Sequence, residues 1–180
     1  MINESAISLE QIAMKLYKTL WVVLLSLNMG QVLALDEGIE VPDCVMKSFD
    51  ASDAQVDLKD LRGKVVYVDF WASWCGPCAK SFPFMNQLHR NLKERGLEVV
   101  AVNVDEQIAD AEDFLSKQPA EFRIALDSQQ ACAKTFDVQA MPSTYLVDRK
   151  GVIRHVHMGF RATDTDNLQS QVDQLLSETP

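Results

Sequence analysis

Two cysteines lie two residues apart where an expected strand meets an expected helix. They belong to the segment Trp-Cys-Gly-Pro-Cys at 74–78, which follows the apolar run at 65–70 and precedes a long helical pattern. Cysteines with this spacing can close a small disulfide, and the unpaired N–H groups at a helix start stabilise a thiolate on the first sulfur. The pattern therefore indicates a reversible redox pair, Cys75 and Cys78, rather than a structural crosslink.

The same spacing also occurs in zinc sites and in inert disulfides. A structural zinc site needs four ligands, and the chain has no second closely spaced ligand pair that includes a cysteine. The two histidines that alternate near the C-terminus are expected on a solvated strand edge. We therefore predict no metal site and no bound cofactor. Apart from Cys75 and Cys78, the cysteines and histidines weighed as zinc ligands for this prediction are Cys44, Cys132, His89, His155 and His157.

The composition fits one globular domain preceded by a targeting segment. The chain has 180 residues and a net charge of −9. It has no cluster of Lys and Arg of the kind that contacts phosphates, so nucleic acid is excluded as an expected partner. One acidic group is most simply interpreted as a solvated helix face: Asp105, Glu106, Asp110, Glu112 and Asp113.

Residues 1–34 are typical of an export signal, which implies a periplasmic location. Two lysines precede an apolar run at 20–27, and Val-Leu-Ala at 32–34 offers the small residues expected at a cleavage site. An uncleaved membrane anchor is the alternative, and against it the apolar run is short for a bilayer span. Because two glutamates in the first ten residues are unusual in a basic leader, a translation start at Met14 also stays open.

The other two cysteines, Cys44 and Cys132, also follow the expected cleavage site. Disulfides persist in an oxidising compartment. One interpretation is therefore a structural disulfide that ties an N-terminal extension at 35–62 to the body of the domain at 63–180. The other interpretation is two separate buried thiols. The sequence leaves both open.

Hydrophobic periodicity predicts strands and helices in alternation. A turn at 148–151 is expected to join the last two strands in a hairpin, and Pro83 is expected to kink the first helix. This order predicts an α/β fold whose sheet has a parallel part and an antiparallel edge. The expected strands are 65–70, 97–104, 122–126, 143–147 and 152–158, and the expected helices are 78–95, 108–117, 127–136 and 164–177.

The strand, the Trp-Cys-Gly-Pro-Cys segment, the following helix and a Met-Pro pair ahead of a hairpin together resemble the thioredoxin superfamily. The export signal, the N-terminal extension and an extra helix and strand within 104–126 are similar to the exported reductase branch that includes TlpA, ResA and the cytochrome c maturation proteins. The resemblance begins near Val41 and extends to the C-terminus. It implies a thioredoxin fold, in which helices flank a central mixed sheet.

The resemblance also implies a role for each site residue. Cys75 is the expected exposed nucleophile, and Cys78 is the expected buried thiol that resolves the mixed disulfide. Asp69 matches the aspartate that takes the proton of the resolving cysteine, and burial is expected to raise its pKa. Ala101 stands where thioredoxin has a lysine facing this aspartate, so the missing cation is expected to raise that pKa further. Strand alternation alone also allows Asp69 to point to solvent.

Met141 and Pro142 match the loop that lies opposite the cysteine pair in the superfamily. The resemblance implies a cis peptide bond before Pro142, whereas a trans turn proline is the alternative from sequence alone. Trp71 is expected in the core. The residues expected to contact substrate are Trp74, Gly76, Pro77, Met141 and Pro142.

These roles imply thiol–disulfide exchange by an exported reductase. Its expected partners are disulfide-containing client proteins and a membrane protein that donates electrons. A disulfide oxidase or isomerase and a cytochrome c maturation thioredoxin use the same residues, and Ser81 stands where the haem-pathway reductases usually have a glutamate. A non-enzymatic metal-binding module is a further alternative. The peroxidase motif Pro-x-x-x-Thr-x-x-Cys does not occur at any cysteine of the chain.

Overall fold

The central strand β3 (Val65–Trp71) has all of its residues buried, and the other elements are arranged around it. The computed structural model describes residues 37–50 and 54–179. The predicted signal peptide, the alternative membrane anchor and the alternative start at Met14 lie outside these residues. Within the described ranges, no helix has both the length and the apolar character needed to cross a membrane.

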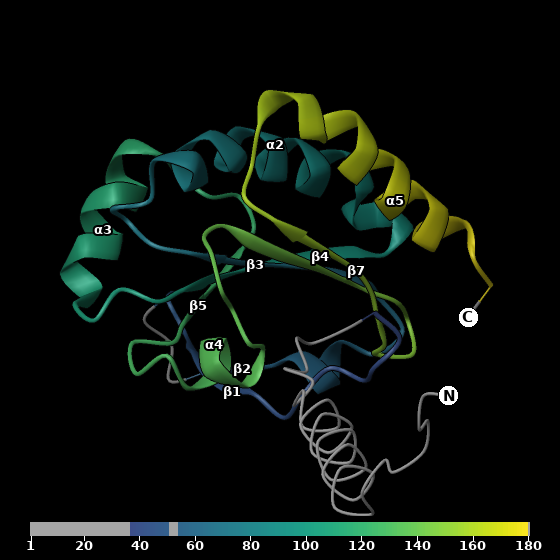
Figure 1. The fold of residues 1–180 in the computed structure, drawn as a ribbon, viewed down its shortest axis with the longest axis horizontal. Helices are drawn as coiled ribbons and strands as arrows, with labels where there is room; N and C mark the ends of the chain where they lie inside the picture. Colours follow the sequence, from purple (N-terminus) through teal and green to yellow (C-terminus); the bar gives the residue numbers. More distant parts are fainter. Residues whose placement is uncertain (1–36, 51–53, 180) are drawn as a thin grey trace, which may run out of the picture. The chain divides into compact units, whose positions relative to one another are not determined.

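The sheet has seven strands in the order β2-β1-β5-β4-β3-β6-β7 (Figure 1). β3 pairs in parallel with β4 (Leu97–Asn103) and antiparallel with β6 (Ser143–Val147). β5 (Arg123–Leu126) continues the parallel part beside β4, and β7 (Ile153–Met158) forms the antiparallel edge beside β6. The predicted α/β fold with a parallel part and an antiparallel edge is confirmed.

The segment before β3 contributes two further strands to the same sheet. β1 (Val45–Ser48) pairs antiparallel with β2 (Gln55–Asp57) and with β5. Residues Leu58–Leu61, directly after β2, form the 3₁₀ helix η1. The sequence predicted neither β1 nor β2, because three or four residues are too few to show an alternating pattern.

Helices cover both faces of the sheet (Figure 1). α2 (Gly76–Leu92) and α5 (Thr165–Ser177) lie on one face, and α4 (Ala131–Thr135) lies on the other. α3 (Ile108–Lys117) is on the α2 side, because Phe114 of α3 stacks on Phe82 of α2 with ring centroids 4.9 Å apart. α2 continues as the 3₁₀ helix η2 (Lys93–Arg95), which ends at Gly96 with a positive φ.

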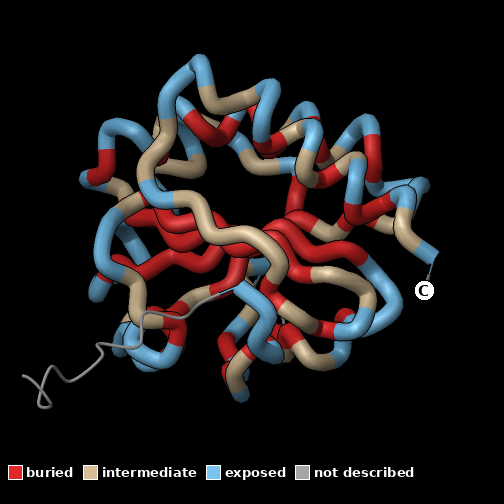
Figure 2. The backbone as a smooth tube through the Cα atoms, turned by 45° about the vertical axis from the view of Figure 1, so that its right-hand side comes forward, coloured by how far each residue is buried: buried red, intermediate tan, exposed pale blue. Residues whose placement is uncertain are grey.

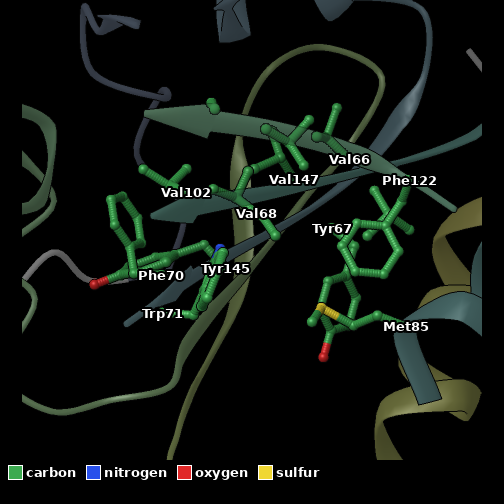
Figure 3. Packing of buried hydrophobic residues seen from close by; sticks show 14 of the residues in the cluster. Val66, Tyr67, Val68, Phe70, Trp71, Met85, Val102, Phe122, Tyr145 and Val147 are labelled. Carbon is green, nitrogen blue, oxygen red and sulfur yellow. The ribbon is translucent and has the colours of Figure 1, made fainter. Parts of the chain in front are cut away.

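The two faces of β3 pack against different elements, and Figure 2 shows the buried strands running through the centre of the molecule. Phe70 stacks on Phe136, just after α4, with ring centroids 5.1 Å apart. Trp71 faces the opposite side and stacks on Phe82 of α2 at 4.9 Å, which confirms its expected place in the core. Met85 projects from α2 toward the same face (Figure 3).

A disulfide joins Cys44, which precedes β1, to Cys132 in α4. The two Cα atoms lie 5.5 Å apart, and the side chains are almost fully buried. The sequence left a bridge and two separate thiols open; the structure contains the bridge. It connects the N-terminal extension to the helix that leads into the Met141–Pro142 loop.

Loss of this bridge is expected to destabilise the protein. In the variant C44A/C132A, we expect the free energy of unfolding to fall by about 2–5 kcal/mol, because the unfolded chain is released from a crosslink across a long loop. Urea unfolding of both proteins, with the other cysteine pair oxidised, measures the difference. As a control, C75S/C78S is expected to show free thiols only after reduction; two free thiols before reduction contradict the bridge.

Candidate active site

The two cysteines of the redox pair lie at the start of α2 and are joined in a disulfide. Cys78 is fully buried, and Cys75 is only 5% exposed. Cys75 is thus less exposed than the resemblance implies, because its sulfur is bonded to Cys78 and turned toward the helix. The Cys78 N–H donates to Cys75 Sγ over 3.2 Å, so the helix start is placed to stabilise a thiolate there once the disulfide is reduced.

The prediction that this helix begins at Cys78 was wrong by two residues. α2 begins at Gly76, and Cys75 is its N-cap residue. Pro77 occupies the first turn, where the missing N–H of proline has no intrahelical partner to lose. The apolar periodicity starts only after these residues, so it could not reveal the first turn.

A groove of about 490 Å³ runs past Cys75. One wall is the start of α2, and the other is the segment 138–141 ahead of the cis peptide bond between Met141 and Pro142. The cis form is the one that the resemblance implies. Four of the five expected substrate contacts line the groove, and Pro142 itself is buried beside it. The lining residues are Trp74, Cys75, Gly76, Pro77, Val138, Gln139, Ala140 and Met141.

Trp74 is the most exposed large apolar side chain of the described residues, at 73%. It therefore stands at the rim of the groove and offers an apolar surface to a bound molecule. A second hollow, between the start of α2 and α3, lies against the same indole.

Asp69 is fully buried in the middle of β3, so the alternative of a solvent-facing side chain is wrong. Its Oδ1 accepts a hydrogen bond of 2.7 Å from the Thr144 hydroxyl, whereas its Oδ2 has no partner within the described part of the chain. Burial raises the pKa of Asp69 to about 7, and the hydrogen bond from Thr144 partly offsets this effect. Ala101 is the residue of β4 that pairs with Asp69, so no cation of that strand faces the carboxyl.

A second buried aspartate supports the loop before Cys75, and its expected place at the surface was wrong. Asp105 was expected on a solvated face, yet it is only 3% exposed. Its Oδ2 accepts the Ser73 N–H over 2.9 Å and the Asn103 amide over 2.7 Å, and its Oδ1 accepts the Ser73 hydroxyl over 3.1 Å. The carboxylate thus holds the loop at the end of β3 in place. Glu106, Asp110, Glu112 and Asp113 are exposed as expected.

The remaining candidate residues are Ser81 on α2 and the two histidines of β7. Ser81 is buried, and its hydroxyl donates to the Cys78 carbonyl over 2.9 Å, so it supplies no carboxylate near the thiols. His155 and His157 are partly exposed on β7 and lie near Glu37 and Asp164 respectively. In the described ranges, no three His, Cys, Asp or Glu side chains are grouped to hold a metal ion.

The site therefore combines a disulfide-forming cysteine pair with a buried carboxyl, Asp69, on the strand that leads to it. After reduction, a thiolate at Cys75 would be stabilised by the helix start, and the groove lies beside it. Sequence reasoning missed two residues, Asp105 and Thr144, that hold this arrangement. Each is a polar residue within or after an apolar strand, which is the signal that could have identified them.

Known proteins share this arrangement of sequence and fold. The Redoxin family profile matches residues 36–176. Thiol-disulfide oxidoreductase ResA from Bacillus subtilis (strain 168) is 33% identical over 126 residues, which cover 70% of this chain and 69% of that protein. The protein of the same name from Bacillus anthracis is 35% identical over 116 residues, which cover 64% of this chain and 66% of that protein.

A solved structure gives the same result for the fold. The crystal structure of a protein described as thiol:disulfide interchange protein DsbE from Chlorobium tepidum matches with a TM-score of 0.76 and 43% identity. The match covers 79% of this chain and 99% of that one. The chain therefore belongs to the Redoxin family, as a thioredoxin-fold thiol-disulfide oxidoreductase of the ResA and DsbE type.

Proposed function

We propose that the protein is an exported reductase that reduces disulfides of client proteins through Cys75 and Cys78. The observation that carries the proposal is the disulfide-forming pair at the start of α2, with Cys75 in the wall of an open groove. Relatives named thiol-disulfide oxidoreductase and thiol:disulfide interchange protein support this chemistry. The expected signal at 1–34 supports a periplasmic location, where client disulfides persist.

The reaction starts from the reduced pair. The Cys75 thiolate attacks one sulfur of a client disulfide, a mixed disulfide forms, and the other client sulfur leaves as a thiolate that takes a proton from water. Cys78 gives its proton to Asp69 and attacks Cys75, which releases the second client sulfur. The client gains two electrons, and the enzyme ends as the Cys75–Cys78 disulfide. A membrane electron-donor protein must then return two electrons.

Asp69 suits the role of proton acceptor for two reasons. Its pKa of about 7 lies near the pH at which the protein would work, so it can both accept and release a proton. Its Oδ2 has no hydrogen-bond partner in the described residues and is free to accept one. The Asp69 side chain also lies on the face of β3 that α2 covers.

The Gly-Pro pair between the cysteines favours a reductase over an oxidase or isomerase. We expect a reduction potential of about −270 mV, as in thioredoxin. Equilibration in glutathione or dithiothreitol buffers, followed by alkylation, measures it. A potential of about −120 mV, typical of strong oxidants, would reverse the assignment. Insulin reduction compared with refolding of a scrambled substrate separates reductase from isomerase.

The Cys78→Ser variant is expected to accumulate mixed disulfides with clients, because the second thiol is missing when the first has reacted. The full chain, expressed with residues 1–34, is trapped with acid and its adducts are identified by mass spectrometry. C75S/C78S is the matched control and should carry none. The absence of adducts contradicts the exchange mechanism, and adducts with cytosolic proteins alone contradict export.

The raised pKa of Asp69 makes stability depend on pH. Between about pH 4 and pH 7 the native protein holds a proton that the unfolded chain has released, so the free energy of unfolding falls as the pH rises. Relative to D69N, which keeps an oxygen for Thr144, the wild type is expected to lose about 2–4 kcal/mol between pH 4 and pH 8.

Urea unfolding of the two oxidised proteins measures this difference at each pH. The depressed pKa values of Glu98, Asp164 and Asp173 are common to both proteins and cancel. A difference that stays constant from pH 4 to pH 8 would show that Asp69 titrates like an ordinary aspartate.

A further inference from the structure

Two hydroxyl groups form a hydrogen-bonded chain that ends at Asp69. Thr144 Oγ1 donates to Asp69 Oδ1 over 2.7 Å, and Tyr67 Oη lies 3.3 Å from Thr144 Oγ1. A threonine hydroxyl can donate only one hydrogen bond, and Thr144 donates it to Asp69. Tyr67 is therefore the donor in the bond between the two hydroxyl groups. All three side chains are buried, with at most 2% exposure.

This chain leaves the two oxygens of the Asp69 carboxyl in different states. Oδ1 accepts from Thr144, while Oδ2 is buried and has no partner within the described ranges. A buried oxygen without a hydrogen bond is costly, so its presence in a well-packed core requires a reason. Acceptance of a proton from a neighbouring thiol is such a reason, because it needs a free lone pair.

The Asp69 side chain and Cys78 belong to the same interface between the sheet and α2. Side chains alternate along a strand, so Asp69 lies on the face of β3 that also carries Tyr67 and Trp71. Trp71 stacks on Phe82 of α2 with ring centroids 4.9 Å apart. Cys78 lies one helical turn before Phe82 on the same buried stripe of α2 and is fully buried.

We propose that Thr144 is a positioning residue for the resolving step: its hydroxyl, backed by Tyr67, holds Asp69 Oδ1 so that Oδ2 receives the proton of Cys78. The assignment rests on the proposed role of Asp69. The Cys78 S–H bond breaks and its proton goes to Oδ2. The Cys78 sulfur then bonds to the Cys75 sulfur while the bond from Cys75 to the client breaks, and the client sulfur leaves with the electron pair.

Few other groups of the described residues act on this carboxyl. On β3, burial and the charge of Asp69 raise the pKa of Tyr67 well above its usual range, so the phenol stays protonated. On β4 the paired residue is Ala101, and on β6 it is the neutral Thr144. On α2, Cys78 is buried on the helix that packs against this face of β3. The Thr144 hydroxyl therefore provides the hydrogen bond that favours the ionised carboxyl.

The test compares Thr144→Val, which removes the hydroxyl and keeps the shape, with Thr144→Ser, which keeps the hydroxyl. The Asp69 side-chain ¹³C shift is titrated in the oxidised protein, and the rate of mixed-disulfide resolution is measured against pH in single turnovers. We expect both midpoints to rise by about one pH unit in T144V, because a hydrogen bond to the charged form is lost. T144S should stay near the wild type, and Tyr67→Phe should shift less, in the same direction.

The first step serves as an internal control. In the Cys78→Ser background, T144V should leave the rate of Cys75 attack unchanged, since Asp69 takes no part in that step. The positioning role of Thr144 is overturned if the two pH midpoints do not move in T144V, or if they move equally in T144S. Either result leaves the role of Asp69 as proton acceptor intact. A wild-type resolution rate that is flat from about pH 5 to pH 9 overturns that role and the assignment together.

Discussion

The burial of β3 is the constraint on which the rest of the structure depends. β3 pairs on both edges and is covered on both faces, so each of its side chains must find a place in the core. This rigid strand ends next to the cysteine pair, which it presents at the start of α2. The same burial puts a carboxyl, Asp69, where water does not reach it, and this raises its pKa into the range of a general base.

The two buried aspartates Asp69 and Asp105 differ in the number of hydrogen bonds that their carboxyl groups accept. Asp105 accepts three hydrogen bonds from the Ser73 amide, the Ser73 hydroxyl and the Asn103 side chain, and it holds the loop before Cys75. Asp69 accepts one bond from Thr144, and its other oxygen has no partner among the residues that the structure describes. A carboxylate that accepts several hydrogen bonds is fixed in place, whereas a buried carboxyl with an unpartnered oxygen in an uncharged site can accept a proton.

The groove is assembled from segments that are far apart in the chain. The start of α2 forms one wall, and residues 138–141 form the other, directly after α4. Cys132 in α4 is bridged to Cys44 near β1, so the N-terminal extension is covalently tied to the element that leads into the groove. The two disulfides thus occupy different places within one oxidised protein: the Cys44–Cys132 bridge crosslinks distant segments, and the Cys75–Cys78 pair lies at the wall of the groove.

Local pattern was enough to predict the alternation of strands and helices and the cysteine pair, because periodicity and the spacing of two cysteines are properties of neighbouring residues. The role expected of Asp69 came instead from the resemblance to the thioredoxin superfamily. The tertiary structure alone decided that Asp105 is buried, that Cys44 meets Cys132, and that Thr144 contacts Asp69. Each of these depends on strand register or on the packing of distant segments. Residues 75 positions apart, such as Thr144 and Asp69, become neighbours only when β3 and β6 pair in one register.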